Sequence, residues 1–334
     1  MRVCLVGTSN SIYKDGYAAG IAQNPGVTEF TKLSIGASPS VIVPYFLADV
    51  DFARFDIVIF DTAINDRNYY INKSIRKEQI REFLEWGIQK ASAAGCRVGL
   101  LLMPTRTAFH KETISGLIYS KLSNETGSLL FDGFEDARVA SNSFGCPTDI
   151  LFIDDYHYLK PFAWRLGSRV IASLLEAKEA PVISKKLPDF YKIHLPSLPN
   201  QTPIIRATSI IERRFIGLET GSTIDLPLGP NDSIVGISIN AANCYGNLRI
   251  GGTKTHIKSL TTQFTGSGKP LQLIVVPFTS PDIRSNDGKV TLSLANDLEI
   301  CTEAGRFDRG NQKSVTRPHY LEIEDVIVRR QLAA

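Results

Sequence analysis

Short apolar runs alternate with longer amphipathic segments over the first 180 residues of this chain. The apolar runs are rich in β-branched residues and lack a polar face, as is typical of strands buried on both sides. The segments between them repeat apolar residues with the period of a helix. This alternation predicts an α/β domain with a doubly wound parallel sheet that helices cover on both faces. The expected strands are residues 2–6, 27–35, 56–60, 97–103 and 129–131, and the expected helices are 12–23, 39–48, 72–94, 107–124 and 161–176.

A second domain is expected after a change of pattern between residues 181 and 204. Prolines at 181, 188, 196, 199 and 203 interrupt any helix there and favour an extended linker. Residues 205–334 then show alternating runs separated by Gly, Asn, Asp and Pro, which predicts a smaller antiparallel β-sandwich, with a jelly roll as one form of it. The expected strands are 222–228, 233–239, 246–250, 271–276 and 290–294, so the predicted domains are 1–180 and 205–334.

The first candidate site residue is Ser9, which follows the apolar run 3–6 and precedes a predicted helix. Ligands of doubly wound sheets bind at the carboxyl ends of the strands. Unpaired backbone N–H groups and the helix dipole favour negative charge at a helix start, which suits a serine alkoxide. The alternative is that Ser9 or Ser11 only caps the helix.

A second candidate pair, Asp154 and His157, follows the apolar run 150–153, and Pro161 opens the next helix pattern. An Asp three residues before a His can accept a hydrogen bond from its Nδ1–H, while Nε2 takes the proton of a serine. Asp155 is the alternative partner of the histidine, or a helix cap. The plainer interpretation of His157 is an ordinary solvated side chain.

Two further residues could stabilise an oxyanion. Asn65 follows the expected strand 56–60 and can present a side-chain N–H₂ group at the same edge of the sheet, although Asn is also common in turns. Gly36 follows another expected strand, where the absence of a side chain lets a backbone N–H approach a substrate oxygen. A nucleophile, an Asp-His pair and amide donors are the parts of a serine esterase or acyltransferase.

The order of these residues resembles that of the SGNH hydrolases, also called GDSL hydrolases, across roughly the first 180 residues. In that family a Ser from a Gly-Asp-Ser motif, a Gly, an Asn from a Gly-x-Asn-Asp motif and a His from an Asp-x-x-His motif follow one another. The resemblance implies a flavodoxin-like domain with Ser9 as nucleophile, His157 as general base and Asp154 as its orienter. It also implies an oxyanion hole made of the Ser9 backbone N–H, Gly36 and Asn65.

The chain departs from the family pattern at two positions, since Thr8 replaces the usual Asp and Ala63 the usual Gly. Neither change removes a catalytic group, and together they mark a divergent member. We expect a serine esterase that forms an acyl-serine intermediate and removes a short acyl group, acetyl, from a carbohydrate. The alternatives are an O-acetyltransferase for a polysaccharide or sugar precursor, and a non-catalytic scaffold that binds a glycan or a protein. Nucleotide binding ranks last, because no Gly-x-Gly-x-x-Gly or Walker loop is present.

Composition narrows the partners. The net charge is +3 and no basic block occurs, so no nucleic acid is expected. Five widely spaced cysteines without a Cys-x-x-Cys pair are typical of reduced thiols, and neither a metal nor a cofactor is expected. No apolar run approaches the ~20 residues that span a bilayer, and no signal-peptide pattern precedes the first strand, so the cytoplasm is the expected location.

The expected partner is a small acylated substrate or a glycan, and the role of the second domain stays open. Carbohydrate binding would rest on fold analogy alone. Residues 205–334 contain no Trp, which favours a packing module or a homo-oligomer formed through this domain. His194, His256 and His319 have no partner that spacing identifies, and we expect them on the surface.

Overall fold

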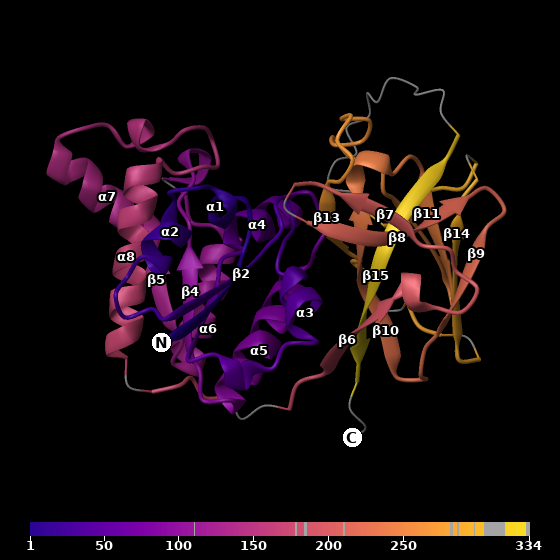
Figure 1. The fold of residues 1–334 in the computed structure, drawn as a ribbon, viewed down its shortest axis with the longest axis horizontal. Coiled ribbons are helices and arrows are strands. Elements are labelled where there is room, and N and C mark those ends of the chain that lie inside the picture. The colour runs from indigo at the N-terminus through magenta and orange to yellow at the C-terminus, as the bar shows by residue number, and fades with distance from the viewer. Residues whose placement is uncertain are drawn as a thin grey trace. The chain divides into compact units, whose positions relative to one another are not determined.

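The computed structural model of the chain forms two compact units (Figure 1). The first unit comprises Met1–Asn68 and Lys77–Lys186, and the second comprises Tyr69–Arg76 and Leu187–Ala334. The structure describes residues 1–109, 111–177, 179–183, 186–209, 211–280, 283–285, 287–296, 298–303 and 318–331.

A five-stranded parallel sheet forms the centre of the first unit. Its strands are β1 (Arg2–Gly7), β2 (Glu29–Ser34), β3 (Ile57–Phe60), β4 (Arg97–Leu102) and β5 (Leu129–Asp132). They lie in the order β2-β1-β3-β4-β5, which is the flavodoxin-like order of doubly wound sheets. Every residue of β3 is buried, as expected for a strand that is covered on both faces. The predicted α/β fold and its five strands are therefore confirmed.

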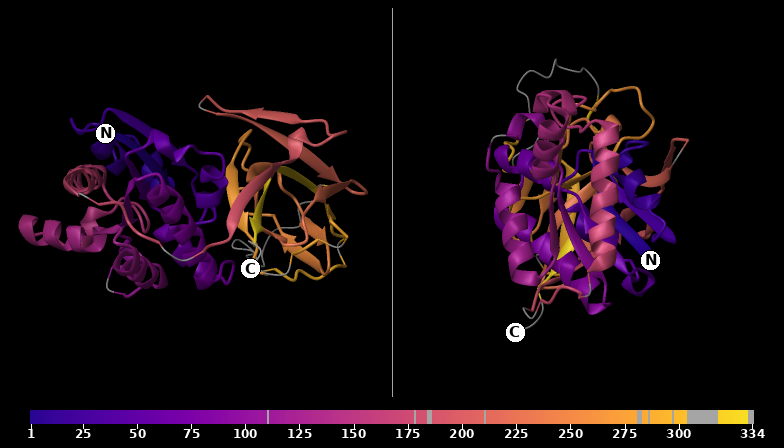
Figure 2. Two further views of the ribbon diagram at one scale, coloured as in Figure 1. Left: turned by 90° about the horizontal axis from the view of Figure 1, so that it is seen from below. Right: turned by 90° about the vertical axis from the view of Figure 1, so that its left-hand side faces the viewer.

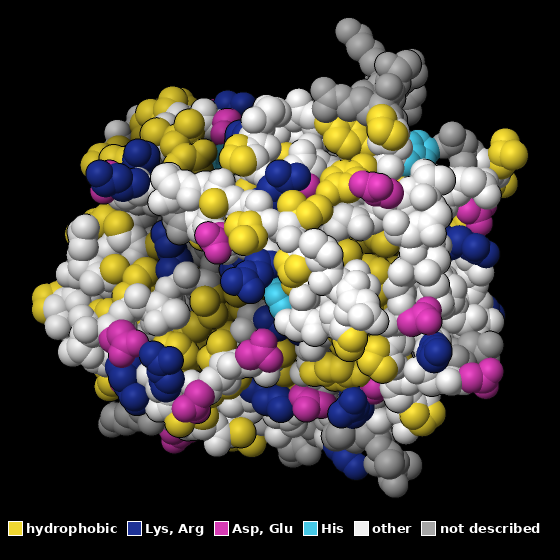
Figure 3. All heavy atoms as spheres, turned by 45° about the vertical axis from the view of Figure 1, so that its right-hand side comes forward, with side chains coloured by type: hydrophobic (Ala, Val, Ile, Leu, Met, Phe, Trp, Pro, Cys, Tyr) yellow, Lys and Arg dark blue, Asp and Glu magenta, His cyan; other side chains and the backbone are white. Residues whose placement is uncertain are grey.

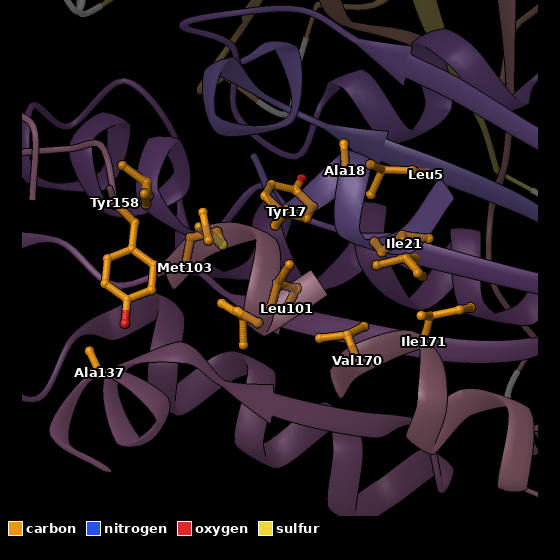
Figure 4. Packing of buried hydrophobic residues seen from close by; sticks show 14 of the residues in the cluster. Leu5, Tyr17, Ala18, Ile21, Leu101, Met103, Ala137, Tyr158, Val170 and Ile171 are labelled. Atoms are coloured by element: carbon orange, nitrogen blue, oxygen red, sulfur yellow. The ribbon is translucent and has the colours of Figure 1, made fainter. Parts of the chain in front are cut away.

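Helices cover both faces of this sheet (Figures 1 and 2). They are α1 (Ser9–Ile12), α2 (Tyr17–Ala22), α3 (Ile42–Leu47), α4 (Ala63–Ile71), α5 (Lys77–Ala93), α6 (Ile114–Thr126), α7 (Gly133–Phe144) and α8 (Lys160–Glu176). On one face Leu5 and Leu101 pack with Tyr17 of α2 and Val170 of α8 in one buried apolar cluster (Figure 4). Because side chains alternate along a strand, the intervening strand residues face the other layer of helices.

Glycines bring α2 and α8 into close contact. A Cβ atom on Gly20 would lie 2.1 Å from the carbonyl oxygen of Trp164, and one on Gly167 would lie 2.0 Å from that of Tyr17. Real Cβ atoms do not approach so closely, so only glycine permits this helix spacing at both positions.

The structure corrects several predicted helices. The helix expected at 12–23 is shortened to α2, because α1 ends at Ile12 and the chain turns before α2, where Asp15 adopts a left-handed φ of 62°. The helix expected at 72–94 begins at Lys77, the one expected at 39–48 is shortened to α3, and the one expected at 107–124 begins at Ile114. Helices α4 and α7 were not predicted.

The second unit contains two antiparallel sheets, which confirms the predicted class of this domain. One sheet has the order β13-β10-β15-β8-β7, with β6 also paired to β15, and the other has the order β12-β11-β14-β9. The strands are β6 (Asp189–His194), β7 (Ile204–Ala207), β8 (Glu212–Glu219), β9 (Thr223–Pro227), β10 (Asp232–Asn240), β11 (Asn247–Gly251), β12 (Thr255–Ser259), β13 (Leu273–Pro277), β14 (Lys289–Leu294) and β15 (Tyr320–Arg330).

Part of the segment 181–204, expected as an extended connector, is the regular strand β6. This strand pairs with β15, a strand that was not predicted because it contains acidic residues.

Two histidines of the second unit have acidic partners. Asp325 of β15 lies 2.8 Å from Nδ1 of His194. His256 is only 8% exposed, and its Nδ1 lies 4.0 Å from Glu303. His194 is therefore exposed as expected but has a partner, whereas the expectation that His256 is a surface residue without a partner is wrong.

The remaining features concern surface charge, free thiols, membrane-spanning helices and metal clusters. On the face drawn in Figure 3, Lys and Arg side chains lie among Asp and Glu side chains rather than in one basic area. Cys4, Cys96 and Cys244 are buried free thiols. Among the described residues, no helix is long and apolar enough to cross a membrane, and no cluster of His, Cys, Asp or Glu is suited to a metal ion.

Candidate active site

Ser9, His157 and Asp154 form one chain of hydrogen bonds in the first unit. Ser9 Oγ lies 3.0 Å from Nε2 of His157. Nδ1 of the same ring lies 2.9 Å from Oδ1 and 2.8 Å from Oδ2 of Asp154. Because both ring nitrogens have oxygen neighbours, the Asp fixes the tautomer in which Nδ1 carries the proton and Nε2 accepts one from Ser9.

Ser9 is the first residue of α1, directly after β1, and Thr8 is the N-cap. Since α1 has only four residues, the contribution expected from a helix dipole is small, whereas the unpaired N–H groups of a first turn remain. Ser11 plays a different part. It is buried, its hydroxyl donates to the Thr8 carbonyl at 2.6 Å, and its oxygen lies 2.7 Å from Ser34 Oγ.

The apolar run 150–153 before Asp154 is not a strand of the sheet, so the loop that carries His157 is not the strand-to-helix connection that this run suggested. Residues Thr148–Leu151 form a 3₁₀ helix, and Phe152 pairs with Tyr158 in an isolated antiparallel bridge. The backbone N–H of Ile153 donates to the His157 carbonyl at 2.8 Å and closes the loop. The loop still reaches the carboxyl end of β1, because His157 contacts Ser9.

Asp154 also shapes this loop. Its Oδ1 accepts the backbone N–H groups of Tyr156 at 2.8 Å and of His157 at 3.0 Å. Partial burial raises the pKa of Asp154, but the Tyr156 N–H and the His157 ring and N–H outweigh it, so the pKa lies below its ordinary value. The carboxylate therefore stays ionised and can stabilise an imidazolium.

Asp155, the alternative partner of His157, points elsewhere. Its Oδ1 accepts hydrogen bonds from Nε of Arg106 at 3.0 Å and from Nη2 at 2.5 Å. The backbone N–H of Arg106 also donates to the Asp155 carbonyl at 3.1 Å. Asp155 thus joins the histidine loop to the loop after β4.

Two residues that support the site were not singled out in the sequence. Asn10 Nδ2 donates to the Tyr156 carbonyl at 3.2 Å and joins α1 to the histidine loop. The Tyr13 ring packs edge-on against His157, with 4.9 Å between ring centroids and 71° between planes. Asn10 could have been suspected from its place beside Ser9, whereas nothing local marked Tyr13.

Gly36 lies beside Ser9 after the end of β2. A Cβ atom on Gly36 would lie 3.9 Å from Ser9 Cβ, at ordinary contact distance. The next residue, Ala37, has a left-handed φ of 61°, so the chain bends sharply here. The structure therefore brings the predicted glycine to the predicted nucleophile.

Asn65 lies in the first turn of α4, rather than in the loop expected after β3. It is 5% exposed, and its Nδ2 has no hydrogen-bond acceptor among the described residues. A buried amide donor without an acceptor is costly, which is typical of a group that meets a ligand. Asn65 follows β3, and β3 lies next to β1, the strand that precedes Ser9. No hydrogen bond joins Asn65 Nδ2 to Ser9 or His157.

Two buried acids, Asp61 and Asp66, follow the carboxyl end of β3. Asp61 Oδ2 accepts the Tyr17 hydroxyl at 2.5 Å, and Asp66 accepts the Ser40 backbone N–H at 2.6 Å and the Thr62 hydroxyl at 2.7 Å. Burial raises the pKa of Asp61 and of Asp66 to about 7. Both acids carry structural hydrogen bonds next to the predicted oxyanion donors.

No protein-family model matches this sequence, and no curated protein does. Among solved structures, the chain is similar to a two-domain esterase (CEX) active on acetylated mannans, co-crystallised with mannopentaose. That match covers 100% of this chain and 92% of the esterase, with 12% identity and a TM-score of 0.65. An acetyl xylan esterase, AlAXEase, matches 52% of this chain at 16% identity and a TM-score of 0.44. A lipolytic protein of the G-D-S-L family from Veillonella parvula matches 53% at 14% identity and 0.42.

The full-length match defines a class of fold, in which a parallel α/β unit is followed by antiparallel β sheets. This chain has the two-domain fold of that carbohydrate esterase. The predicted resemblance is therefore confirmed at the level of the fold.

Proposed function

We propose that this protein is a serine esterase that removes acetyl groups from a carbohydrate through an acyl-serine intermediate. The hydrogen-bond chain from Ser9 through His157 to Asp154 carries the proposal, because it joins two segments far apart in the sequence in the order that nucleophilic catalysis requires. No metal or cofactor is needed for this chemistry.

In the first half of the reaction, Ser9 Oγ attacks the carbonyl carbon of the acetyl ester while His157 Nε2 takes the hydroxyl proton. The carbonyl oxygen becomes an oxyanion that the backbone N–H groups of Ser9 and Gly36 and the Asn65 amide would stabilise. The C–O bond to the sugar then breaks, and His157 returns the proton to the departing sugar hydroxyl. Asp154 stabilises the imidazolium throughout.

In the second half, His157 takes a proton from water as the water oxygen attacks the acetyl-serine. The tetrahedral intermediate breaks its bond to Ser9 Oγ, which regains a proton, and acetate leaves. A sugar hydroxyl in place of water would make the same protein an O-acetyltransferase, so the acceptor distinguishes the two activities.

The choice of substrate rests on the full-length structural match. The matching two-domain esterase is active on acetylated mannans, which makes an acetylated glycan the first substrate to test. The match shows the fold alone, so the sugar itself remains a proposal.

The experiment compares acetate, butyrate and octanoate p-nitrophenyl esters, then acetylated mannan and acetylated xylan, with and without an added glycan acceptor. We expect the acetate ester to be hydrolysed fastest and acetate to be released from an acetylated glycan. Both activities should be lost in Ser9→Ala. A preference for octanoate, or acetate release unchanged in Ser9→Ala, would contradict the proposal. Acetylation of the added glycan would instead identify the transferase.

A further inference from the structure

We infer that Asp66 is a positioning residue of the oxyanion hole, which holds the loop that contains Gly36 against the start of the helix that contains Asn65. The inference rests on the proposed function and assigns to Asp66 a part that neither the triad nor the oxyanion donors perform.

The two oxygens of Asp66 hold two different segments. Oδ1 accepts the backbone N–H of Ser40, four residues after Gly36, at 2.6 Å. Oδ2 accepts the hydroxyl of Thr62, the residue before α4, at 2.7 Å. One carboxyl group therefore links the segment after β2 to the segment after β3, on either side of β1 and Ser9.

Asp66 is also fixed to the backbone beside Asn65. Its own N–H donates to the Thr62 carbonyl at 2.9 Å, which forms the first turn of α4. The Thr62 hydroxyl lies 2.8 Å from Tyr119 Oη, so α6 supports the same group. Asp66, Thr62 and Tyr119 are each 0% exposed, so water does not compete for these hydrogen bonds.

The oxyanion donors themselves have less support, with one weak hydrogen bond from the Ser38 hydroxyl to the Gly36 carbonyl at 3.4 Å. Asn65 Nδ2 has no acceptor among the described residues, and Gly36 has no side chain to anchor it. A donor contributes to catalysis only when it is held at the place where charge develops. Asp66 is suited to this task, because it is adjacent to Asn65 in sequence and hydrogen-bonded to the loop of Gly36.

The test uses the full chain with Asp66→Ala and Asp66→Asn. The Ala variant removes both hydrogen bonds, whereas Asn can accept the Ser40 N–H and donate to the Thr62 oxygen. With an acetate ester as substrate, we expect Asp66→Ala to lower kcat by about 10-fold or more with little change in KM. Asp66→Asn should restore most of that loss. Asp136→Asn is the matched control, since Asp136 is a buried acid that pairs with Arg165 and Arg169 and, among the described residues, makes no hydrogen bond or ion pair with the triad. The kcat of this variant should match that of the unchanged protein.

A double-mutant cycle distinguishes positioning from a general loss of stability. If Asp66 acts through Asn65, then adding Asp66→Ala to Asn65→Ala should lower kcat by much less than Asp66→Ala does alone. Assays run well below the unfolding temperature of each variant. Should Asp66→Ala fail to fold, Thr62→Val removes the shared hydroxyl and takes its place in the cycle.

Two results would overturn the inference: an unchanged kcat in Asp66→Ala, or the same fold-loss in both backgrounds. These results are distinct from failure of the proposed function. In that case the unchanged protein would hydrolyse no ester and Ser9 would not react with a fluorophosphonate, whatever residue stands at position 66.

Discussion

Two neighbouring aspartates show how strongly individual contacts decide function at the residue scale. Asp154 and Asp155 are adjacent, and spacing alone allowed either of them to orient His157. In the structure both oxygens of Asp154 lie within 2.9 Å of the imidazole, whereas Asp155 binds Arg106. The first contact belongs to the proposed chemistry and the second to the support of a loop.

Replacing these aspartates should therefore have unequal effects. Asp154→Asn keeps the shape of the side chain but favours the wrong imidazole tautomer, and we expect kcat to fall by about 10²–10⁴-fold. Asp155→Asn should lower kcat much less, because it weakens only the pairing with Arg106. Ester hydrolysis at saturating substrate measures both. A larger loss in Asp155→Asn would mean that the assigned partner of His157 is wrong.

Asn65 provides a second comparison at this scale. Asn65→Ala should lower kcat by about 10²–10³-fold with little change in KM, because the amide donates mainly to the oxyanion of the transition state. Steady-state kinetics with a p-nitrophenyl acetate substrate separate the two constants. A rise in KM at unchanged kcat would instead assign Asn65 to ground-state binding.

The sequence located the candidate site residues better than their surroundings. Ser9, His157, Asp154 and Gly36 could be found in the sequence, because each lies in a short local motif and the motifs follow one another in a known order. Asn10 and Tyr13 went unnoticed, since their roles depend on a loop about 145 residues away, which no local pattern reports.

At the scale of elements, the contact between α2 and α8 supports the segment that follows Ser9. Gly20 and Gly167 let the two backbones approach until a Cβ atom would overlap a carbonyl oxygen. Any side chain there must push the helices apart, and α2 follows α1 after only a short turn.

Gly167→Ala should therefore destabilise the protein by about 1–3 kcal/mol, despite the higher helix propensity of Ala. Ser173→Ala is the matched control, because Ser173 is exposed on the same helix and should change stability by less than about 0.5 kcal/mol. Urea denaturation followed by circular dichroism compares them. Equal midpoints would show that the helices accommodate a methyl group without cost.

The elements that the sequence missed have physical causes. The helix expected at 12–23 is shortened because the chain turns at Asp15, which takes a left-handed conformation that periodicity does not detect. Strand β15 was hidden because it contains buried acids: Glu322 pairs with Arg206, and Asp325 with His194. A charged strand interior becomes plausible only when its distant partners are known.

At the scale of the whole molecule, buried acids make stability depend on pH. Burial raises the pKa of Asp66 to about 7, well above the value of an unfolded chain. The protonated form is favoured in the folded state, so its contribution to stability is full below about pH 4 and is lost as the pH rises through about 7. Asp61 acts in the same direction.

Asp66→Asn cannot ionise, so its Tm relative to that of the unchanged protein should increase between about pH 4 and about pH 7 and then level off. The pH effects of groups that do not interact with Asp66 are common to both proteins and cancel in the difference, whereas Asp61 is coupled to the Asp66 charge. Differential scanning calorimetry measures both melting temperatures. A constant difference, or one that moves in the opposite direction, would contradict the raised pKa.

The class of each unit was predictable from periodicity, because a parallel sheet and antiparallel sheets impose different patterns on local sequence. The strand order in the second unit was not, because β15 is the last described strand and pairs with β6, β8 and β10. Long-range pairing of this kind leaves little trace in any local window.

The central claim is that Ser9 is an activated nucleophile, and covalent labelling tests it most directly. Incubation with a fluorophosphonate, followed by peptide mass spectrometry, should place one adduct on Ser9. The adduct should be absent in Ser9→Ala and retained in measurable part in Ser11→Ala, whose hydroxyl is engaged by Thr8 and Ser34. Full labelling of Ser9→Ala, or an adduct on another serine of the unchanged protein, would contradict the account.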